Sequence, residues 1–536
     1  MSERPSTLPA LLAKVVAARG AHPAIVMQSG VLTYAELDQR SAQLAQALLA
    51  TGAGKGTRIA LMAPDGILWV TSFLAGLRIG ALVTVVSTLC TPAELAHILR
   101  HSDIQMLIGV REFLRHDYID TLTVALPGLA EGQAGALRLP AAPYLRSIWL
   151  DNADGVTWAR SVAQLMTRAD DPHAPDTALL AAVEQQVSST DDAVIVYTSG
   201  STSLPKAVVH TQRTVALHPP EVAKLFLLQP HDRMMPLLPA FWLGGLVMAL
   251  EVLSAGATLV YPESPELDVV LETIERFKVN RVNSWGDMLV KLRSAATARG
   301  IDVDAIVGLG PFRDRDGELI PPHLQSNMLG MSETFAVHSA EPLDARLPES
   351  RAGASGRSIN GYERHIVNPE TGVEVKPGEV GELQLRGGAL MSGLYKVPRE
   401  NVFTSDGFYP TSDLVRVDED GYLYFVARRG DMIKTKAANV SRLEVEAALR
   451  ALPEVDIPVV AGLTDPELGQ RVVAAVVLQV GANATEASLQ VALRATLSSY
   501  KVPRNIIFID EADIPRTSTG KVKLFELSNM ISARIG

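Results

Sequence analysis

The sequence lacks several features that would place it in other classes of protein. It has one cysteine, Cys90, among 536 residues, so neither an intramolecular disulfide nor a thiolate metal cluster can form. Its formal net charge is −10 and it has no run of Lys or Arg, which argues against nucleic acid as the main partner. The most apolar stretches, residues 71–89 and 243–253, are interrupted by Arg78 and Glu251, so neither is an uncharged run long enough to span a bilayer.

The N-terminus also lacks a secretory signal. Residues 1–20 contain no basic stretch followed by an unbroken apolar core and a small-residue cleavage site, and their pattern predicts an amphipathic helix instead. Hydrophobic residues make up 47% of the chain and charged residues 20%, as is typical of a folded globular protein. We therefore expect a cytoplasmic protein without an integral membrane segment and without a nucleic-acid partner.

Short apolar runs bounded by Gly, Pro, Asp or hydroxyl residues alternate with amphipathic patterns over the first half of the chain. Residues 59–63, 192–197 and 257–261 predict buried strands, and residues 34–49 and 267–277 predict helices. Alternation of strands with helices is typical of α/β sheets.

The pattern changes twice in the second half of the chain. Residues 368–421 are rich in Gly, Pro and charge, which predicts β-hairpins and turns. After Gly430 the pattern predicts helices at residues 442–451 and 487–497 and a strand at residues 471–480. Because 536 residues exceed what one hydrophobic core supports, we expect two domains. We predict an α/β domain of stacked sheets with a β-rich subdomain at 1–429, and a small mobile α+β domain at 430–536, with Gly430 able to absorb a change in φ and ψ.

A hydroxyl-rich segment follows the strand predicted at 192–197. It reads Tyr197-Thr-Ser-Gly-Ser-Thr-Ser-Leu-Pro-Lys206, in which hydroxyls, loop amides and one lysine can cradle nucleotide phosphates. The segment is not a Walker A motif, because it does not have the GxxxxGK[ST] spacing. A Ser/Thr-rich surface turn is the alternative interpretation of this segment taken alone.

This segment resembles the phosphate loop of the adenylate-forming superfamily, which includes acyl- and aryl-CoA synthetases, nonribosomal peptide adenylation domains and beetle luciferases. Segments similar to other motifs of that superfamily follow in the correct order, at residues 32–37, 239–245, 329–333, 381–383, 393–395, 409–413, 428–446 and 515–521. The chain is thus identified as a member over nearly its whole length. The resemblance implies an enzyme that joins a carboxylic acid to AMP and passes the acyl group to a thiol, using ATP, Mg²⁺ and coenzyme A, and it allows a homodimer.

The resemblance also implies roles for individual residues at the nucleotide. The residues expected to bind the phosphates are Thr198, Ser199, Gly200, Ser201, Thr202 and Lys206. Glu333 is expected to bind Mg²⁺, a hard ion that carboxylate and phosphate oxygens can hold without a dedicated cage. Ser332 is expected to contact the α-phosphate, Leu329 the adenine, and Asp413 the ribose hydroxyls with Arg428 beside it. Residues expected to act in catalysis are Lys521, Lys434, Thr202 and Glu333.

Lys521 lies in Pro515-Arg-Thr-Ser-Thr-Gly-Lys521, which resembles the C-terminal lysine loop of the superfamily. The resemblance places its ammonium between the substrate carboxylate and the α-phosphate during adenylation. A fixed cation offsets the repulsion between two anions and stabilises in-line displacement.

The acid substrate is constrained by an expected apolar pocket. Positions that resemble pocket-lining residues of the superfamily are Trp242, Gly244, Gly245, Met248, Trp285 and Met331. None is charged, which disfavours an amino acid, whose ammonium would need a buried partner. We expect a medium- or long-chain or an alicyclic acid, with an aromatic acid as the alternative.

The chain departs from the superfamily pattern at several glycines. Ser or Ala replaces glycine at Ser203, Ala207, Ser412, Ala427 and Ala437. If any of these positions requires a positive φ, the strain costs about 1 to 3 kcal/mol. Leu329 also replaces a tyrosine that stacks on adenine, and Ala437 lies where a glycine borders the pantetheine channel.

Other functions remain open at this stage. A stand-alone enzyme that loads a carrier protein is the first alternative, and an aryl-CoA ligase is the second. An inactive nucleotide-binding relative is less favoured, because charged residues are seldom retained for packing. The charged residues concerned are Lys206, Glu333, Asp413, Arg428, Lys434 and Lys521.

Overall fold

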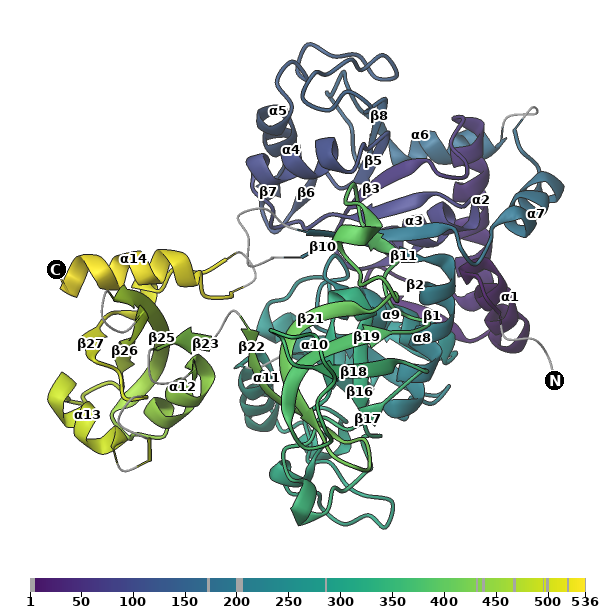
Figure 1. The fold of residues 1–536 in the computed structure, drawn as a ribbon. Helices are drawn as coiled ribbons and strands as arrows, with labels where there is room; N and C mark the ends of the chain where they lie inside the picture. Colours follow the sequence, from purple (N-terminus) through teal and green to yellow (C-terminus); the bar gives the residue numbers. More distant parts are fainter. Residues whose placement is uncertain are drawn as a thin grey trace. The chain divides into compact units, whose positions relative to one another are not determined.

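The structure is a computed structural model that divides into two compact units (Figure 1). The described residues are 5–170, 174–198, 206–284, 287–429, 432–435, 439–465, 469–494, 496–497, 501–517 and 520–535. The first unit comprises residues 1–364 and 385–409, and the second comprises 365–384 and 410–536. Each unit is described by itself below.

An eight-stranded sheet forms one layer of the first unit. Its strand order is β20 (Gly393–Leu394), β11 (Lys206–Thr211), β10 (Asp192–Thr198), β4 (Leu82–Val85), β3 (Arg58–Met62), β5 (Met106–Gly109), β8 (Ser147–Leu150), β9 (Arg160–Ser161). Strands from β10 to β9 run parallel, whereas β11 pairs antiparallel with β10 and β20. Parallel strands need crossover connections, and helices α3 (Ile67–Arg78), α4 (Pro92–His101) and α5 (Tyr118–Ala125) provide them.

A five-stranded sheet forms a second layer of the same unit. Its order is β14 (Arg281–Asn283), β12 (Arg233–Pro236), β13 (Thr258–Val260), β1 (Pro23–Met27), β2 (Gly30–Thr33). The predicted strands at 59–63, 192–197 and 257–261 correspond to β3, β10 and β13, and the predicted helices at 34–49 and 267–277 are α2 (Tyr34–Ala50) and α10 (Leu267–Phe277).

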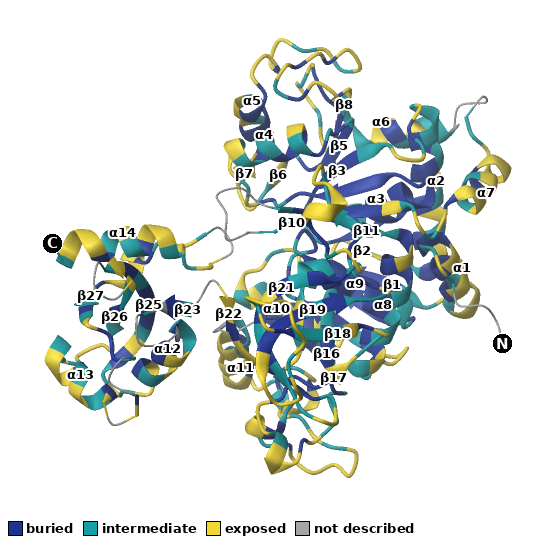
Figure 2. Cartoon of the chain, viewed as in Figure 1, coloured by how far each residue is buried: buried dark blue, intermediate teal, exposed yellow. Residues whose placement is uncertain are grey.

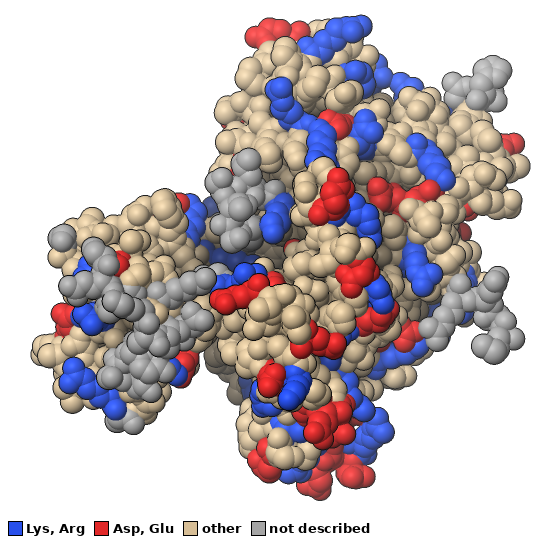
Figure 3. Space-filling view, in the orientation of Figure 1, with Lys and Arg blue, Asp and Glu red and all other residues tan. Residues whose placement is uncertain are grey.

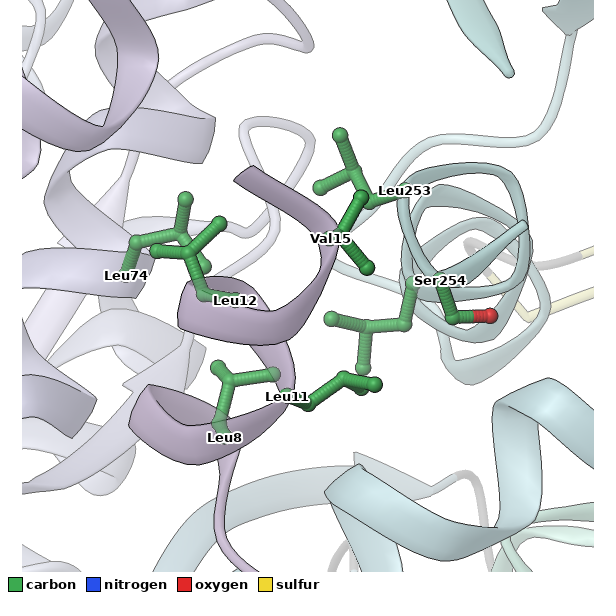
Figure 4. Close-up of a pocket in the computed structure, with 8 residues that line it drawn as sticks. Leu8, Leu11, Leu12, Val15, Leu74, Leu253 and Ser254 are labelled. Atoms are coloured by element: carbon green, nitrogen blue, oxygen red, sulfur yellow. The ribbon is translucent and has the colours of Figure 1, made fainter. Parts of the chain in front are cut away.

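One large core joins both sheets of the first unit to helices α2, α3, α8 (Gln212–Leu225) and α9 (Leu243–Ser254). Figure 2 shows α3 and the central strands as dark, buried elements. The predicted N-terminal helix is α1 (Leu8–Arg19). Its residues Leu8, Leu11, Leu12 and Val15 face α3 and α9 around a small apolar gap (Figure 4).

Two smaller sheets follow, and two strands of the second lie within residues 368–421, where the Gly- and Pro-rich composition predicts β-hairpins and turns. The first has the order β15 (Leu329–Met331), β16 (Ala336–Ala340), β17 (Arg357–Ser358). The second has the order β18 (Glu363–Val367), β19 (Val380–Arg386), β21 (Tyr409–Val417), β22 (Leu423–Arg428).

The C-terminal part of the second unit is an α+β arrangement with its own hydrophobic clusters. Predicted elements appear as α12 (Arg442–Arg450), β26 (Gly469–Leu478) and α13 (Glu486–Leu493). The sequence reading missed β25 (Val455–Asp465) and the last helix, α14 (Leu524–Ile535). Strands β25, β26 and β27 (Asn505–Phe508) form one sheet, with α12 and α14 among the helices that contact it.

On the face shown in Figure 3, Lys and Arg side chains are interspersed with Asp and Glu. Among the described residues, no helix is both long enough and apolar enough to cross a membrane.

Candidate active site

The phosphate segment begins and ends on two paired strands. Thr198 at the end of β10 lies directly opposite Lys206 at the start of β11. Both side chains are half-buried, and no ion pair of Lys206 occurs with another described residue. Between these strand ends lie Ser199, Gly200, Ser201, Thr202 and Ser203, which fall outside the described residues. The sequence-predicted phosphate lysine is therefore anchored on a regular strand.

Glu333 lies in a single helical turn, η4 (Ser332–Thr334), between β15 and β16. Its Oε1 accepts a hydrogen bond of 2.8 Å from the hydroxyl of Tyr409, and the residue is half-buried. Ser332, predicted at the α-phosphate, is the first residue of the same turn and is also half-buried.

The donor set at Glu333 fits Mg²⁺. Within the described ranges, no group of three His, Cys, Asp or Glu side chains is placed to hold a metal ion. Mg²⁺ commonly binds through one or two carboxylates together with substrate phosphates and water, so one half-buried carboxylate suffices.

Asp413 and Arg428 form a cross-strand pair in the second unit. They are register partners on β21 and β22, and Arg428 Nε donates to Asp413 Oδ1 at 2.8 Å. The Asp413 side chain is 4% exposed, whereas that of Arg428 is 52% exposed. Hydrogen bonds to a carboxylate are stronger than those between neutral groups, which suits this side chain to the predicted ribose contact.

The predicted glycine replacements differ in their backbone conformation. Ser412 has a φ of +64°, so this position does have the left-handed conformation that glycine tolerates best. Its N–H donates to Glu382 Oε1 at 3.1 Å, which helps to hold the strained peptide in place. Ala207 and Ala427 lie in β11 and β22 without a positive φ. Ser203 and Ala437 lie outside the described residues.

Four of the six predicted acyl-pocket residues lie at the start of α9 or in its first turns. Trp242 is half-buried, packs edge-on against Phe241 with 5.5 Å between ring centroids, and immediately precedes the helix. Gly244 and Met248 lie one turn apart on α9, while Trp285 falls outside the described residues. Gly245 has a close-packing role, because a Cβ there would lie 2.2 Å from the Leu238 carbonyl oxygen.

Two residues of β15 are predicted to contact ligands. Leu329, predicted at the adenine, and Met331, predicted at the acyl group, lie at the two ends of this strand and are half-buried. Met331 packs against the small cluster that contains Met391 and Tyr409.

The two predicted catalytic lysines lie in the second unit. Lys521 is exposed, its backbone oxygen accepts the Thr517 N–H at 2.7 Å, and the preceding Gly520 has a φ of +79°. Lys434 is the last residue of β23 (Met432–Lys434), and its side chain lies outside the described part of the chain.

The sequence reading missed an acidic residue beside the predicted acyl segment. Asp65 Oδ1 accepts the Ala240 N–H at 2.7 Å, and Asp65 lies deep in the first unit although part of its side chain remains open. Burial raises the pKa of this carboxyl to about 7. An acidic residue in the otherwise apolar run after β3 was the available signal, and a perturbed pKa in such a place is typical of functional sites.

Solved structures with the same fold cover nearly the whole chain. ATP-bound MatB from Rhodopseudomonas palustris matches with a TM-score of 0.74 at 22% identity, covering 97% of this chain and 98% of the other. Fatty acyl CoA synthetase from Mycobacterium tuberculosis matches with a TM-score of 0.69 at 23% identity, covering 99% of each chain. The chain therefore has the same overall fold as these two solved structures.

Family models and curated relatives define the membership more narrowly. The model "AMP-binding enzyme" matches residues 12–395, and "AMP-binding enzyme C-terminal domain" matches residues 444–521. The chain belongs to the AMP-binding enzyme family, as the sequence motifs predicted.

Several relatives are similar along most of their length. The sulfoacetate–CoA ligase of Cupriavidus necator is 29% identical, with 93% of this chain and 92% of the relative covered. The 3-hydroxybenzoate–CoA/4-hydroxybenzoate–CoA ligase of Thauera aromatica is 28% identical, with coverage of 96% and 95%. The mitochondrial medium-chain acyl-CoA ligase of Rattus norvegicus is 26% identical, with coverage of 95% and 85%.

Proposed function

We propose that this protein is an AMP-forming acid–CoA ligase. The observation that carries the proposal is the retention of the charged set on a family-typical framework. Lys206 begins β11, Glu333 lies on the turn that β11 contacts, and Asp413 is held by Arg428 on its own sheet. A protein that had lost catalysis would have no need to keep these charges, since charged residues are rarely required for packing.

The proposed first step is adenylation. A carboxylate oxygen of the acid attacks the α-phosphorus of ATP, and pyrophosphate leaves with the electrons of the broken P–O bond. Lys206 and the hydroxyls of the phosphate segment would hold the β- and γ-phosphates, and Lys521 would neutralise charge where the two anions meet. Bound at Glu333, Mg²⁺ would supply neutralisation of phosphate charge.

The proposed second step is thioester formation. The thiol of coenzyme A loses its proton to solvent and its sulfur attacks the acyl carbon. The bond from that carbon to the phosphate oxygen breaks, and AMP leaves with this oxygen. Relatives named as CoA ligases support coenzyme A as the acceptor over a carrier protein. Lys434 and the predicted rotation about Gly430 belong to this step.

The acid is proposed to be fatty or alicyclic. Support comes from Trp242, Met248 and Met331, which are apolar and lie at positions matched to the pocket. The relatives above are named for a sulfonated, an aromatic and an aliphatic acid at similar identity, so an aryl acid is the second candidate.

We further propose a cytoplasmic location, supported by the single cysteine, which fits a reducing compartment. A homodimer is the proposed assembly, to be checked by light scattering. Neither affects the chemistry above.

A product assay tests the proposal. The protein is incubated with Mg-ATP and a panel of fatty, alicyclic and aryl acids, and pyrophosphate, AMP and acyl-CoA are measured. We expect pyrophosphate with at least one acid and thioester only when coenzyme A is added. Pyrophosphate without thioester would favour carrier-protein loading, and no pyrophosphate with any acid would favour an inactive relative.

A further inference from the structure

The turn that carries Glu333 has each of its backbone carbonyls held by a different part of the first unit. Ser332 O accepts from His210 Nε2 of β11 at 2.7 Å. Glu333 O accepts from the Met391 N–H at 2.8 Å, and Thr334 O accepts from the Tyr362 hydroxyl at 2.7 Å. A three-residue turn needs no such support to form, so three separate anchors indicate that its position is important.

The two residues that follow this turn have a strained backbone. Phe335 has a φ of +49° and Ala336 a φ of +82°, so two consecutive non-glycine residues lie in the left-handed region. Each costs about 1 to 2 kcal/mol for an L-residue. Phe335 is fully buried and its ring packs edge-on against His210, with 4.7 Å between ring centroids. Strain of this kind persists where surrounding contacts over-determine it, and it clusters at functional sites.

The carboxylate itself is oriented by Tyr409. Its hydroxyl donates to Glu333 Oε1 at 2.8 Å, while the ring is 8% exposed and packs edge-on against Phe403 at 6.1 Å. The other carboxylate oxygen, Oε2, has no hydrogen-bond partner among the described residues. One oxygen is therefore fixed by the protein and the second remains available to a ligand.

We propose that Tyr409 and His210 are positioning residues for Glu333, the expected magnesium ligand. Tyr409 orients the Glu333 carboxylate directly, and His210 holds the backbone carbonyl of the neighbouring Ser332. This inference rests on the proposed function, because Mg²⁺ enters with ATP. A metal held by one protein carboxylate depends strongly on the groups that orient that carboxylate, and removing such partners typically weakens metal affinity by about 10- to 100-fold.

Tyr409→Phe is the sharpest test, because it removes one hydroxyl and keeps the ring in its cluster. The readout is the thermal stabilisation by ATP as a function of Mg²⁺ concentration, which needs no turnover. We expect the half-saturating Mg²⁺ concentration to rise about tenfold. Pyrophosphate release should recover toward the parent value at high Mg²⁺, since the carboxylate is still present.

Tyr34→Phe is the matched control. Tyr34 is also buried and its hydroxyl donates to Ala257 O at 2.6 Å, away from the turn. The Tyr34→Phe variant should have a lower melting temperature than the parent, while its half-saturating Mg²⁺ concentration should be unchanged. An equal change in the two variants would overturn the inference, because it would mean that any lost buried hydroxyl perturbs Mg²⁺ binding.

Two His210 variants test the second contact. Glutamine can place its amide nitrogen near the position of Nε2, so His210→Gln should keep a half-saturating Mg²⁺ concentration near that of the parent. His210→Leu removes the donor and should raise it. Parent-like Mg²⁺ dependence in both Tyr409→Phe and His210→Leu would overturn the inference, while a parent protein that ATP and Mg²⁺ together fail to stabilise would overturn the proposed function as well.

Discussion

At the scale of single residues, Ser412 is a serine in a backbone conformation that favours glycine. The sequence identified five positions where glycine was expected, and the structure finds a positive φ at only one of those it describes. The peptide is held by Glu382 on the neighbouring strand and by Thr411, whose hydroxyl accepts the Asp413 N–H at 3.0 Å. Strain at Ser412 therefore lies directly beside the predicted ribose carboxylate.

Replacing two of the three described candidates, Ser412 and Ala427, by glycine should give opposite results. Ser412→Gly should raise the free energy of unfolding by about 1 kcal/mol, because it relieves the left-handed strain. Ala427 lies in β22 and is 0% exposed. Ala427→Gly should lower the free energy of unfolding by about 1 to 2 kcal/mol, because it adds backbone entropy to the unfolded chain and removes a buried methyl group. Chemical denaturation of both variants measures this. Equal destabilisation would contradict our assignment of strain to Ser412.

Glu251 is a second residue whose environment the sequence could not reveal. It was noticed only as a charge that interrupts an apolar run, yet in α9 it is 3% exposed with no ion pair among the described residues. Burial raises its pKa to about 8. Its folded pKa exceeds the ordinary value of 4.5, so the folded state binds the proton more tightly.

This difference predicts a pH-dependent stability. Stability from proton uptake at Glu251 is fully present below pH 4.5 and is lost as the pH rises through about 8. Glu251→Gln stays neutral, so its melting temperature should exceed that of the parent by several degrees at pH 9. The advantage should shrink toward pH 5. A constant difference across this range would mean that Glu251 does not titrate as its burial implies.

At the scale of elements, periodicity and turn signals located the regular structure well. Strands β3 and β10 and helices α2 and α10 lie within a few residues of the predicted bounds, because each presents one clear period over enough residues. Contacts between elements were not predictable. Tyr409 and Glu333 are 76 positions apart in the chain, and no local pattern indicates that the hydroxyl reaches the carboxylate.

Gly245 in the first turn of α9 also has a role that the sequence did not reveal, because this role depends on contacts between elements. A Cβ would lie 2.2 Å from Leu238 O and 2.3 Å from Pro239 O, so α9 can approach the end of β12 only with glycine here. Gly245→Ala should destabilise the protein by about 1 to 3 kcal/mol, as overpacking does. Gly393→Ala is the control, because no atom lies within 4 Å of its added Cβ and its φ is ordinary. Thermal melts of the two variants give the comparison, and equal melting temperatures would refute the close approach.

At the scale of the whole molecule, the division into two units separates the predicted chemistry. Lys206 and Glu333 belong to the first unit, and Asp413, Lys434 and Lys521 to the second. We propose, from the resemblance to adenylate-forming enzymes, that residues 430–536 serve the two half-reactions in different orientations. The predicted boundary at Gly430 stays a prediction, because this residue lies outside the described ranges.

Lys521→Ala should affect one half-reaction and spare the other. Adenylation, measured as pyrophosphate release, should fall by roughly two orders of magnitude or more, about 2.7 kcal/mol in barrier height. Thioester formation from synthetic acyl-AMP should stay near the parent rate, since no α-phosphate is attacked there. One protein preparation serves both assays, so misfolding would appear as loss of both. Near-normal pyrophosphate release would assign the role to another cation, with Lys434 the first to examine.

The central claim is that the acid is activated as an acyl adenylate and then transferred to coenzyme A. Oxygen labelling tests it most directly. An accepted acid carrying ¹⁸O in its carboxylate is converted with Mg-ATP and coenzyme A, and the nucleotide product is examined by mass spectrometry. The mechanism predicts AMP that carries one ¹⁸O atom from the acid, with unlabelled pyrophosphate. Formation of ADP with labelled phosphate, or of AMP without label, would contradict it.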